Sequence, residues 1–241
     1  QTWFLVKDSL KLTSPYYLKD SSYYNYDPNN PVLTIGGFDF FGMYNPDSIL
    51  FGPRNLNPIN NRNDVLIFTS DILNQPLAVI GQPILNLYAS SNRLDTDFIV
   101  MLADVYPDGR SILISEGVLK ARHRNGLDRE DLLNPNEIYQ FTIKLRNTAY
   151  VFNQGHRIRI YITSSKYPSY EPNPNNGGPF KRNDPNKLIA LNKVFTGQVY
   201  PSYILLPVNN SIIGIKEIAS TLKVKSCLIK NRQAVCDGYI P

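Results

Sequence analysis

Long apolar runs are missing from this chain of 241 residues. No stretch approaches the ~18–20 apolar residues that a membrane-spanning helix needs, so we expect no membrane segment. The first seven residues, from Gln1 to Lys7, lack a basic region ahead of an apolar one and do not predict a signal peptide. They also lack an initiator Met, which suggests a fragment or a processed product of a longer protein.

Cysteine and histidine, the usual metal ligands, are scarce. The chain has only two of each, and His123 and His156 are far in sequence from Cys227 and Cys236. A zinc site needs four ligands close together, so we predict no metal site. A disulfide between the cysteines would close only a short terminal loop, and we favour free thiols in a peripheral tail. The cysteines do not identify the compartment, and a cytoplasmic location is slightly favoured.

The motif that presents a hydrolase serine, Gly-x-Ser-x-Gly, occurs nowhere in the chain. His123 lies among cationic residues, where a general base would be poorly placed. His156 follows Gly155 at the head of a strand pattern, as a residue leaving a turn does. We therefore predict no catalytic residue.

Charge is modest and dispersed. The net charge is +5, and no Lys/Arg-rich run with interleaved aromatics indicates a nucleic-acid partner. Four aspartates, Asp95, Asp97, Asp104 and Asp108, suggest a carboxylate cluster. Asp108 belongs to a turn, and Asp95 and Asp97 flank the start of a strand, where Asp accepts backbone N–H bonds. The alternative is that the carboxylates bind calcium. The glycine pairs do not open helices, so phosphate binding has little support and no cofactor is predicted.

Alternating apolar residues are abundant from residue 64 onward. Phe98 to Val105 and Ser111 to Lys120 predict two strands, joined by a tight turn at Tyr106-Pro107-Asp108-Gly109. Further strands are predicted at 64–70, 77–81, 83–90, 138–145, 149–152, 156–165, 194–197 and 203–208. Short strands at this spacing, without a long amphipathic helix, predict an all-β sandwich or jelly roll over residues 64–208.

The two flanking regions differ from this pattern. Residues 1–63 are crowded with Tyr, Asn, Pro, Gly and Ser, which predicts an irregular but ordered aromatic-rich arm. In this arm, the rings of Phe38, Phe40 and Phe41 either cover the domain's own core or pack on a partner or line a pocket. Residues 209–241 are weakly patterned, and Ile212 to Val224 fits either a helix or a pair of strands.

Linked motifs along the chain resemble a known family. They are Tyr26-Asp27-Pro28 through Gly36-Gly37, Arg62-x-Asp64-Val65-Leu66-x-Phe68-Thr69-Ser70, Ala89-Ser90-Ser91 with Asp95-Thr96-Asp97-Phe98, Asp104-Val105-x-Pro107-Asp108-Gly109-Arg110, Phe152 with Gly155-His156-Arg157-Ile158-Arg159, and Ser164-Ser165 with Asn173-Pro174-Asn175-x-Gly177-Gly178. Over roughly residues 3–208, the chain resembles the C-terminal part of the X-Pro dipeptidyl-peptidase/cocaine esterase/α-amino-acid ester hydrolase family, which includes cephalosporin acylases.

The resemblance implies a galactose-binding-like jelly roll that packs on an α/β-hydrolase domain, in the same or a separate polypeptide. That missing domain would carry the catalytic triad, and this chain would be its non-catalytic companion. Phe40 and Phe41 match positions that lean over the active site in relatives, so they are expected to line its substrate pocket. Two other hypotheses stay open, a free-standing carbohydrate-binding module and a self-contained hydrolase, and so does homo-oligomerisation.

Overall fold

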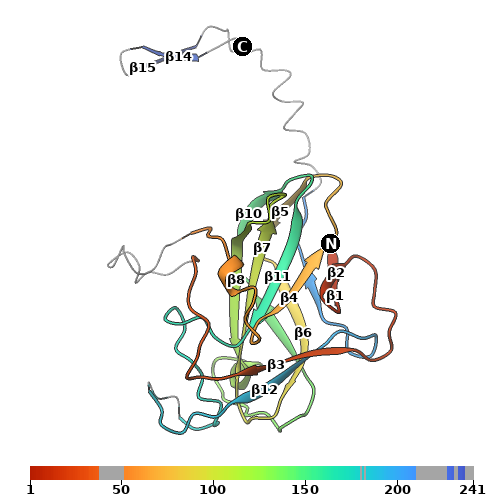
Figure 1. Ribbon diagram of the computed structural model, residues 1–241, viewed down its shortest axis with the longest axis vertical. Coiled ribbons are helices and arrows are strands. Elements are labelled where there is room, and N and C mark those ends of the chain that lie inside the picture. Colours follow the sequence, from red (N-terminus) through yellow and green to blue (C-terminus); the bar gives the residue numbers. More distant parts are fainter. Residues whose placement is uncertain (38–51, 180, 182, 210–226, 231–232, 237–241) are drawn as a thin grey trace. The chain divides into compact units, whose positions relative to one another are not determined.

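The structure is a computed structural model of the chain (Figure 1). It describes residues 1–37, 52–179, 181, 183–209, 227–230 and 233–236. The chain divides into two compact units, Gln1–Val208 and Asn209–Pro241. Among the described residues, no helix is both long and apolar enough to cross a bilayer.

Strands are the main regular elements in the described parts of both units. The strands are β1 (Thr2–Val6), β2 (Ser9–Lys11), β3 (Ser21–Tyr26), β4 (Leu66–Ser70), β5 (Leu77–Gly81), β6 (Ile84–Ser91), β7 (Asp97–Val105), β8 (Ser111–Lys120), β9 (Tyr139–Lys144), β10 (Thr148–Phe152), β11 (Arg157–Thr163), β12 (Ala190–Phe195), β13 (Tyr203–Leu205), β14 (Cys227–Lys230) and β15 (Gln233–Cys236). Two short 3-10 turns are described, Asn57–Ile59 and Ala121–His123. The all-β fold predicted from the alternating pattern is confirmed.

One large sheet folds back on itself to make a sandwich. Among the described residues its strand order is β3-β12-β6-β13-β1-β2-β4-β11-β7-β8, with β9 also paired to β6. In Figure 1, β4, β11 and β7 lie side by side. β1 pairs with β13, whereas its hairpin partner β2 pairs in parallel with β4. The β1–β2 hairpin therefore carries the sheet from one layer to the other.

The main core lies between these two layers and uses alternate residues of each strand. It includes Leu85, Leu87 and Ala89 of β6, Phe98, Val100 and Leu102 of β7, and Ile158, Ile160 and Ile162 of β11. Every second residue of a strand points to the same face, so this burial follows directly from the sequence pattern. In β6 and β11 the face that points to the core is the one that carries the alternating apolar residues.

A second, smaller core explains why β7 is apolar from Phe98 to Val105 except at Asp104. Met101 and Ala103 of β7 pack on the outer side of the sandwich with Val32, Leu56 and Ile59. These last three come from the N-terminal region, which thus covers the outer face of β7 and β11. A strand buried on both faces carries a continuous apolar run rather than an alternating one.

The N-terminal 63 residues are more regular than the sequence suggested. β1, β2 and β3 all belong to the large sheet, so the picture of a wholly irregular arm is corrected for residues 2–26. Their short lengths and the many Tyr, Ser and Asn residues hid the pattern. Long-range pairing stabilises them, since β3 pairs along its full length with β12.

Candidate functional site

Gly36 and Gly37, which precede residues 38–51, and Gly52, which follows them, form a narrow neck. Gly37 and Gly52 exchange two backbone hydrogen bonds, with N···O distances of 2.9 and 3.0 Å. Gly36, Gly37 and Gly52 have φ values of +63°, +96° and +73°, which L-residues with a Cβ rarely adopt. The neck therefore brings the two ends of the 38–51 segment together at a defined place on the sandwich.

A buried ion pair lies directly beneath the neck. The Lys166 ammonium donates to the Glu116 carboxylate and, at 3.1 Å, to the Gly36 carbonyl. The two charged side chains are only 1% and 3% exposed. A Cβ on Gly37 would lie 2.5 Å from Lys166 Nζ and 2.8 Å from both Glu116 carboxylate oxygens. The backbone of the neck thus rests on the ion pair, and a side chain at Gly37 would have to displace its charged groups.

A cleft of about 300 Å³ opens beside the neck. Its lining includes Gly37, Gly52, Glu116, Arg146 and Tyr150. The Tyr150 hydroxyl donates to Asp104 at 2.8 Å. Burial raises the pKa of Tyr150, and so do its hydrogen bonds with Tyr106 and Asp104. The phenol therefore stays protonated and remains a donor.

The Asp104 carboxylate also binds His156, so Tyr150, Asp104 and His156 form a three-residue polar network. His156 Nδ1 lies 2.8 and 3.0 Å from the two carboxylate oxygens, and the Tyr106 ring packs on the imidazole with centroids 4.4 Å apart. Asp104 is fully buried and His156 nearly so. Among the described hydrogen bonds, the His156 ring contacts Asp104 alone, and no serine hydroxyl joins it.

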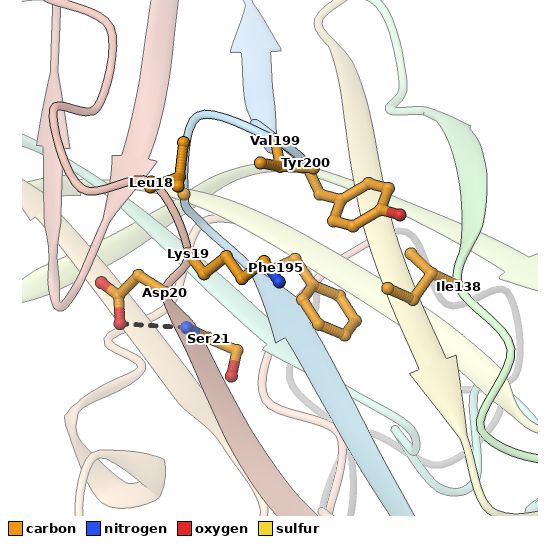
Figure 2. Close-up of a pocket in the computed structure, with 9 residues that line it drawn as sticks. Leu18, Lys19, Asp20, Ser21, Ile138, Phe195, Val199 and Tyr200 are labelled. Carbon is orange, nitrogen blue, oxygen red and sulfur yellow. Dashed lines mark hydrogen bonds between the residues drawn. The ribbon is translucent and has the colours of Figure 1, made fainter.

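A second and larger cavity, of about 670 Å³, lies away from the neck (Figure 2). Phe195 and Tyr200 contribute aromatic rings in edge contact, 5.7 Å between centroids. Leu18 and Asp20 lie on the other side of the cavity, and the Lys19 side chain extends toward Phe195. One Asp20 carboxylate oxygen accepts a hydrogen bond from the Ser21 N–H at 2.9 Å, while the other is buried and has no partner among the described residues.

The comparisons with known proteins identify the family. The sequence profile described as X-Pro dipeptidyl-peptidase C-terminal non-catalytic domain matches residues 1–205. The chain belongs to this family. Cocaine esterase from Rhodococcus sp. (strain MB1 Bresler) is 38% identical over 186 residues, which are 77% of this chain and 32% of the esterase.

Solved structures of other proteins have the same fold as this X-Pro dipeptidyl-peptidase C-terminal domain. An α-amino acid ester hydrolase is 27% identical, with a TM-score of 0.76 over 86% of this chain and 36% of that one. An aminopeptidase from the marine sediment archaeon Thaumarchaeota archaeon is 24% identical, with a TM-score of 0.78 over 87% of this chain and 37% of that one, and at this identity it shows the fold alone. The chain spans about a third of the length of these relatives.

The site residues that the sequence predicted, Phe40 and Phe41, lie outside the described residues. The neck shows where the segment that carries them is attached. Sequence reasoning missed the ion pair beneath it, because Lys166 and Glu116 are 50 residues apart. A glutamate inside the apolar pattern of β8 was the available signal.

The four aspartates do not form one cluster in this family member. Asp95 binds Arg122 at 2.8 Å, and Asn173 donates to both Asp95 and Asp97. Burial raises the pKa of Asp97 to about 6. Asp108 accepts hydrogen bonds from Arg110 in the β7–β8 turn. In the part of the chain that the structure describes, no three or more His, Cys, Asp or Glu residues are placed to hold a metal ion.

The histidines occupy different settings from each other. His123, the last residue of the Ala121–His123 turn, is half-buried, and its Nδ1 lies 2.9 Å from the Arg129 carbonyl. His156 leaves the turn at Gly155, where the sequence placed it, and its pairing with Asp104 was not predicted. The lone acid in the apolar run of β7 was the signal for this pair, since a buried carboxylate needs a partner.

Proposed function

We propose that this chain serves as the C-terminal companion of a serine acyl hydrolase, packing on an α/β-hydrolase domain and helping to form its substrate pocket. The neck carries this proposal. Two hydrogen bonds join Gly37 to Gly52, and the buried Lys166–Glu116 ion pair supports them. The ends of the 38–51 segment are therefore fixed on the sandwich, as they must be if the segment forms a wall of a neighbouring pocket.

The relatives support the proposal through their names and their lengths. The cocaine esterase and the α-amino acid ester hydrolase are both ester-cleaving proteins by name, and this chain matches about a third of each. The remaining two thirds of such a protein has room for a catalytic domain. We therefore infer that ester or amide bonds are the substrate class of the whole protein.

Replacing Phe40 and Phe41 together by Ala in the complete hydrolase tests this proposal. We expect kcat/KM for its ester substrates to fall by at least about tenfold, because one buried phenyl ring contributes about 1.5–3 kcal/mol and about 1.4 kcal/mol is a factor of ten. Steady-state kinetics on a panel of acyl esters would measure the effect.

Leu127→Ala is the matched control, since this side chain is 87% exposed on a different loop. The control should leave kcat/KM unchanged, and both variants should keep the melting temperature of the parent. An unchanged kcat/KM in the double variant, on every substrate, would remove Phe40 and Phe41 from the pocket.

The larger cavity favours a second candidate function, a carbohydrate-binding module. Its volume suits a small ligand. Tyr200 and Phe195 offer apolar ring surfaces, while Asp20, Lys19 and Ser21 offer polar groups of the kind that hold hydroxyls.

A sugar titration discriminates this candidate from the first. If the cavity binds saccharides, isothermal titration with galactose and with glucose will give a saturable heat for at least one of them, and Tyr200→Ala will abolish it. If the chain is only the companion of a hydrolase, neither sugar will give a saturable heat with the parent protein.

A further inference from the structure

We infer that Asn125 is a site of covalent modification, at which the side-chain amide is lost through attack by the next backbone nitrogen. The chain contains two Asn-Gly dipeptides, Asn125-Gly126 and Asn176-Gly177. A glycine after the asparagine favours the reaction, because no Cβ hinders the approach of its nitrogen. The two dipeptides share this local chemistry, so the structure around each decides which one reacts. The inference is independent of the hydrolase proposal.

The reaction needs only water as a co-reactant. The Gly126 backbone nitrogen, on losing its proton, attacks the Asn125 side-chain carbon Cγ. The new C–N bond closes a succinimide ring, and Nδ2 of Asn125 takes up a proton and leaves as ammonia. Water then opens the ring, giving aspartate when it attacks Cγ and isoaspartate when it attacks the backbone carbonyl carbon. Overall, one amide and one water become one carboxylic acid and one ammonia, with no change of oxidation state.

The Asn125 side chain is exposed and weakly held. It lies just after the Ala121–His123 turn, and its Nδ2 donates one hydrogen bond, of 2.8 Å, to the Asp131 carboxylate. Its Oδ1 accepts none among the described residues. The Gly126 N–H donates to the His123 carbonyl at 3.2 Å, the long end of the usual range. Only these two bonds have to break before the nitrogen can approach Cγ.

The Asn176 side chain is instead fixed at both ends of its amide. Its Oδ1 accepts from the Gly178 N–H at 2.9 Å. Its Nδ2 donates to the Asp184 carboxylate at 3.1 Å and to the Asn186 carbonyl at 3.2 Å. The Gly177 N–H makes no hydrogen bond among the described residues, so the attacking nitrogen is not what protects this site. The protection comes from the amide, which has to turn and then depart as ammonia.

Loss of the amide changes the charge of the loop. A carboxylate in place of the Asn125 amide would face the Asp131 carboxylate, and like charges at hydrogen-bond distance repel. Asp131 also pairs with Arg129, and its carbonyl accepts from Arg124. A displaced Asp131 therefore frees both arginines, and we expect the modified loop to be cleaved more readily by trypsin.

Peptide mapping of the full chain tests the inference. The protein is incubated in mildly alkaline buffer, with and without urea, and digested with trypsin at mildly acidic pH. The amide, aspartate and isoaspartate forms of each Asn-Gly peptide are then separated and quantified. In the folded chain we expect Asn125 to lose its amide at least about tenfold faster than Asn176, because a tenfold ratio corresponds to about 1.4 kcal/mol, close to the contribution of one hydrogen bond.

Urea provides the control for the structural cause. Without the fold the two dipeptides keep only their shared chemistry, so the ratio of their rates should fall toward one. Equal rates in the folded chain, or faster loss at Asn176, would overturn the inference. A ratio that urea leaves unchanged would also overturn it, since the neighbouring sequence rather than the structure would then set the rates.

Variants at Asn125 test the site and its effect on the loop. In Asn125→Gln the ring that would form is larger and closes more slowly, so ammonia release from this peptide should stop on the time scale of the parent's reaction. Asn125→Asp should be cut by trypsin after Arg124 or Arg129 several times faster than Asn125→Ser, which removes the amide without adding a charge. Equal cleavage of these two variants would overturn the effect on the loop.

Discussion

Gly37→Ala is expected to lower the free energy of unfolding by about 3 kcal/mol. The positive φ of +96° costs a residue with a Cβ about 1–2 kcal/mol. The added methyl would also lie 2.5 Å from the Lys166 ammonium and 2.8 Å from the Glu116 carboxylate, and overpacking of this kind costs about 1–3 kcal/mol. Urea denaturation of the isolated chain, followed by circular dichroism, would measure the difference.

Gly109→Ala provides the matched control for this change. Gly109 has a similar φ of +88°, but a Cβ there meets nothing within 4 Å. Gly109→Ala should therefore lower the free energy of unfolding only by the cost of the positive φ, about 1–2 kcal/mol. An equal loss of unfolding free energy in the two variants would mean that the ion pair moves aside for the added methyl group at no cost. Close packing at the neck would then not be needed for stability.

Lys166→Met is expected to destabilise the fold by about 3–5 kcal/mol, the usual cost of leaving a buried charge without its partner. The Glu116 carboxylate would keep its burial and lose the ammonium. The Gly36 carbonyl would lose the same donor, which loosens the neck as well. Denaturant unfolding would give the loss in free energy.

A second substitution separates the charge from the packing. In Lys166→Met with Glu116→Gln, the orphaned negative charge is gone, so the double variant should recover a substantial part of the loss. Lys11→Met, at the exposed pair with Asp71, should cost no more than about 1 kcal/mol. A loss in Lys166→Met as small as that in Lys11→Met would contradict a structural role for the buried pair.

Activity of the complete hydrolase adds a readout to both predictions. If the neck positions Phe40 and Phe41, Gly37→Ala should lower kcat/KM even at temperatures where the variant is fully folded, whereas Gly109→Ala should not. A stability loss without an effect on kcat/KM would confine the neck to a structural role and leave the fold argument intact.

Much of the fold could be predicted because β-strand patterns are local. In Leu85 to Ala89 and in Arg157–Thr163 every second residue is apolar, and this alone assigns the strand and the face that points to the core. The Asp108-Gly109 turn was equally local, since Gly109 adopts the positive φ that the turn requires. The three N-terminal strands were missed because their pairing with distant strands, not their own composition, makes them regular.

The candidate site was less predictable for a related reason. Its pairs join residues far apart in the chain, Lys166 with Glu116 and His156 with Asp104. A charged residue within an apolar strand indicates that a partner exists, but it does not name the partner. Only the order of strands in the sheet brings the two residues together.

The sequence by itself determined that this chain is an all-β domain, where most of its strands run, and which family its motifs resemble, because periodicity and short motifs are properties of neighbouring residues. Tertiary structure alone decided that the N-terminal region covers the outer face of β7 and that a buried ion pair supports the glycine neck. Each of these depends on strand pairing and packing across long sequence separations, which composition does not encode.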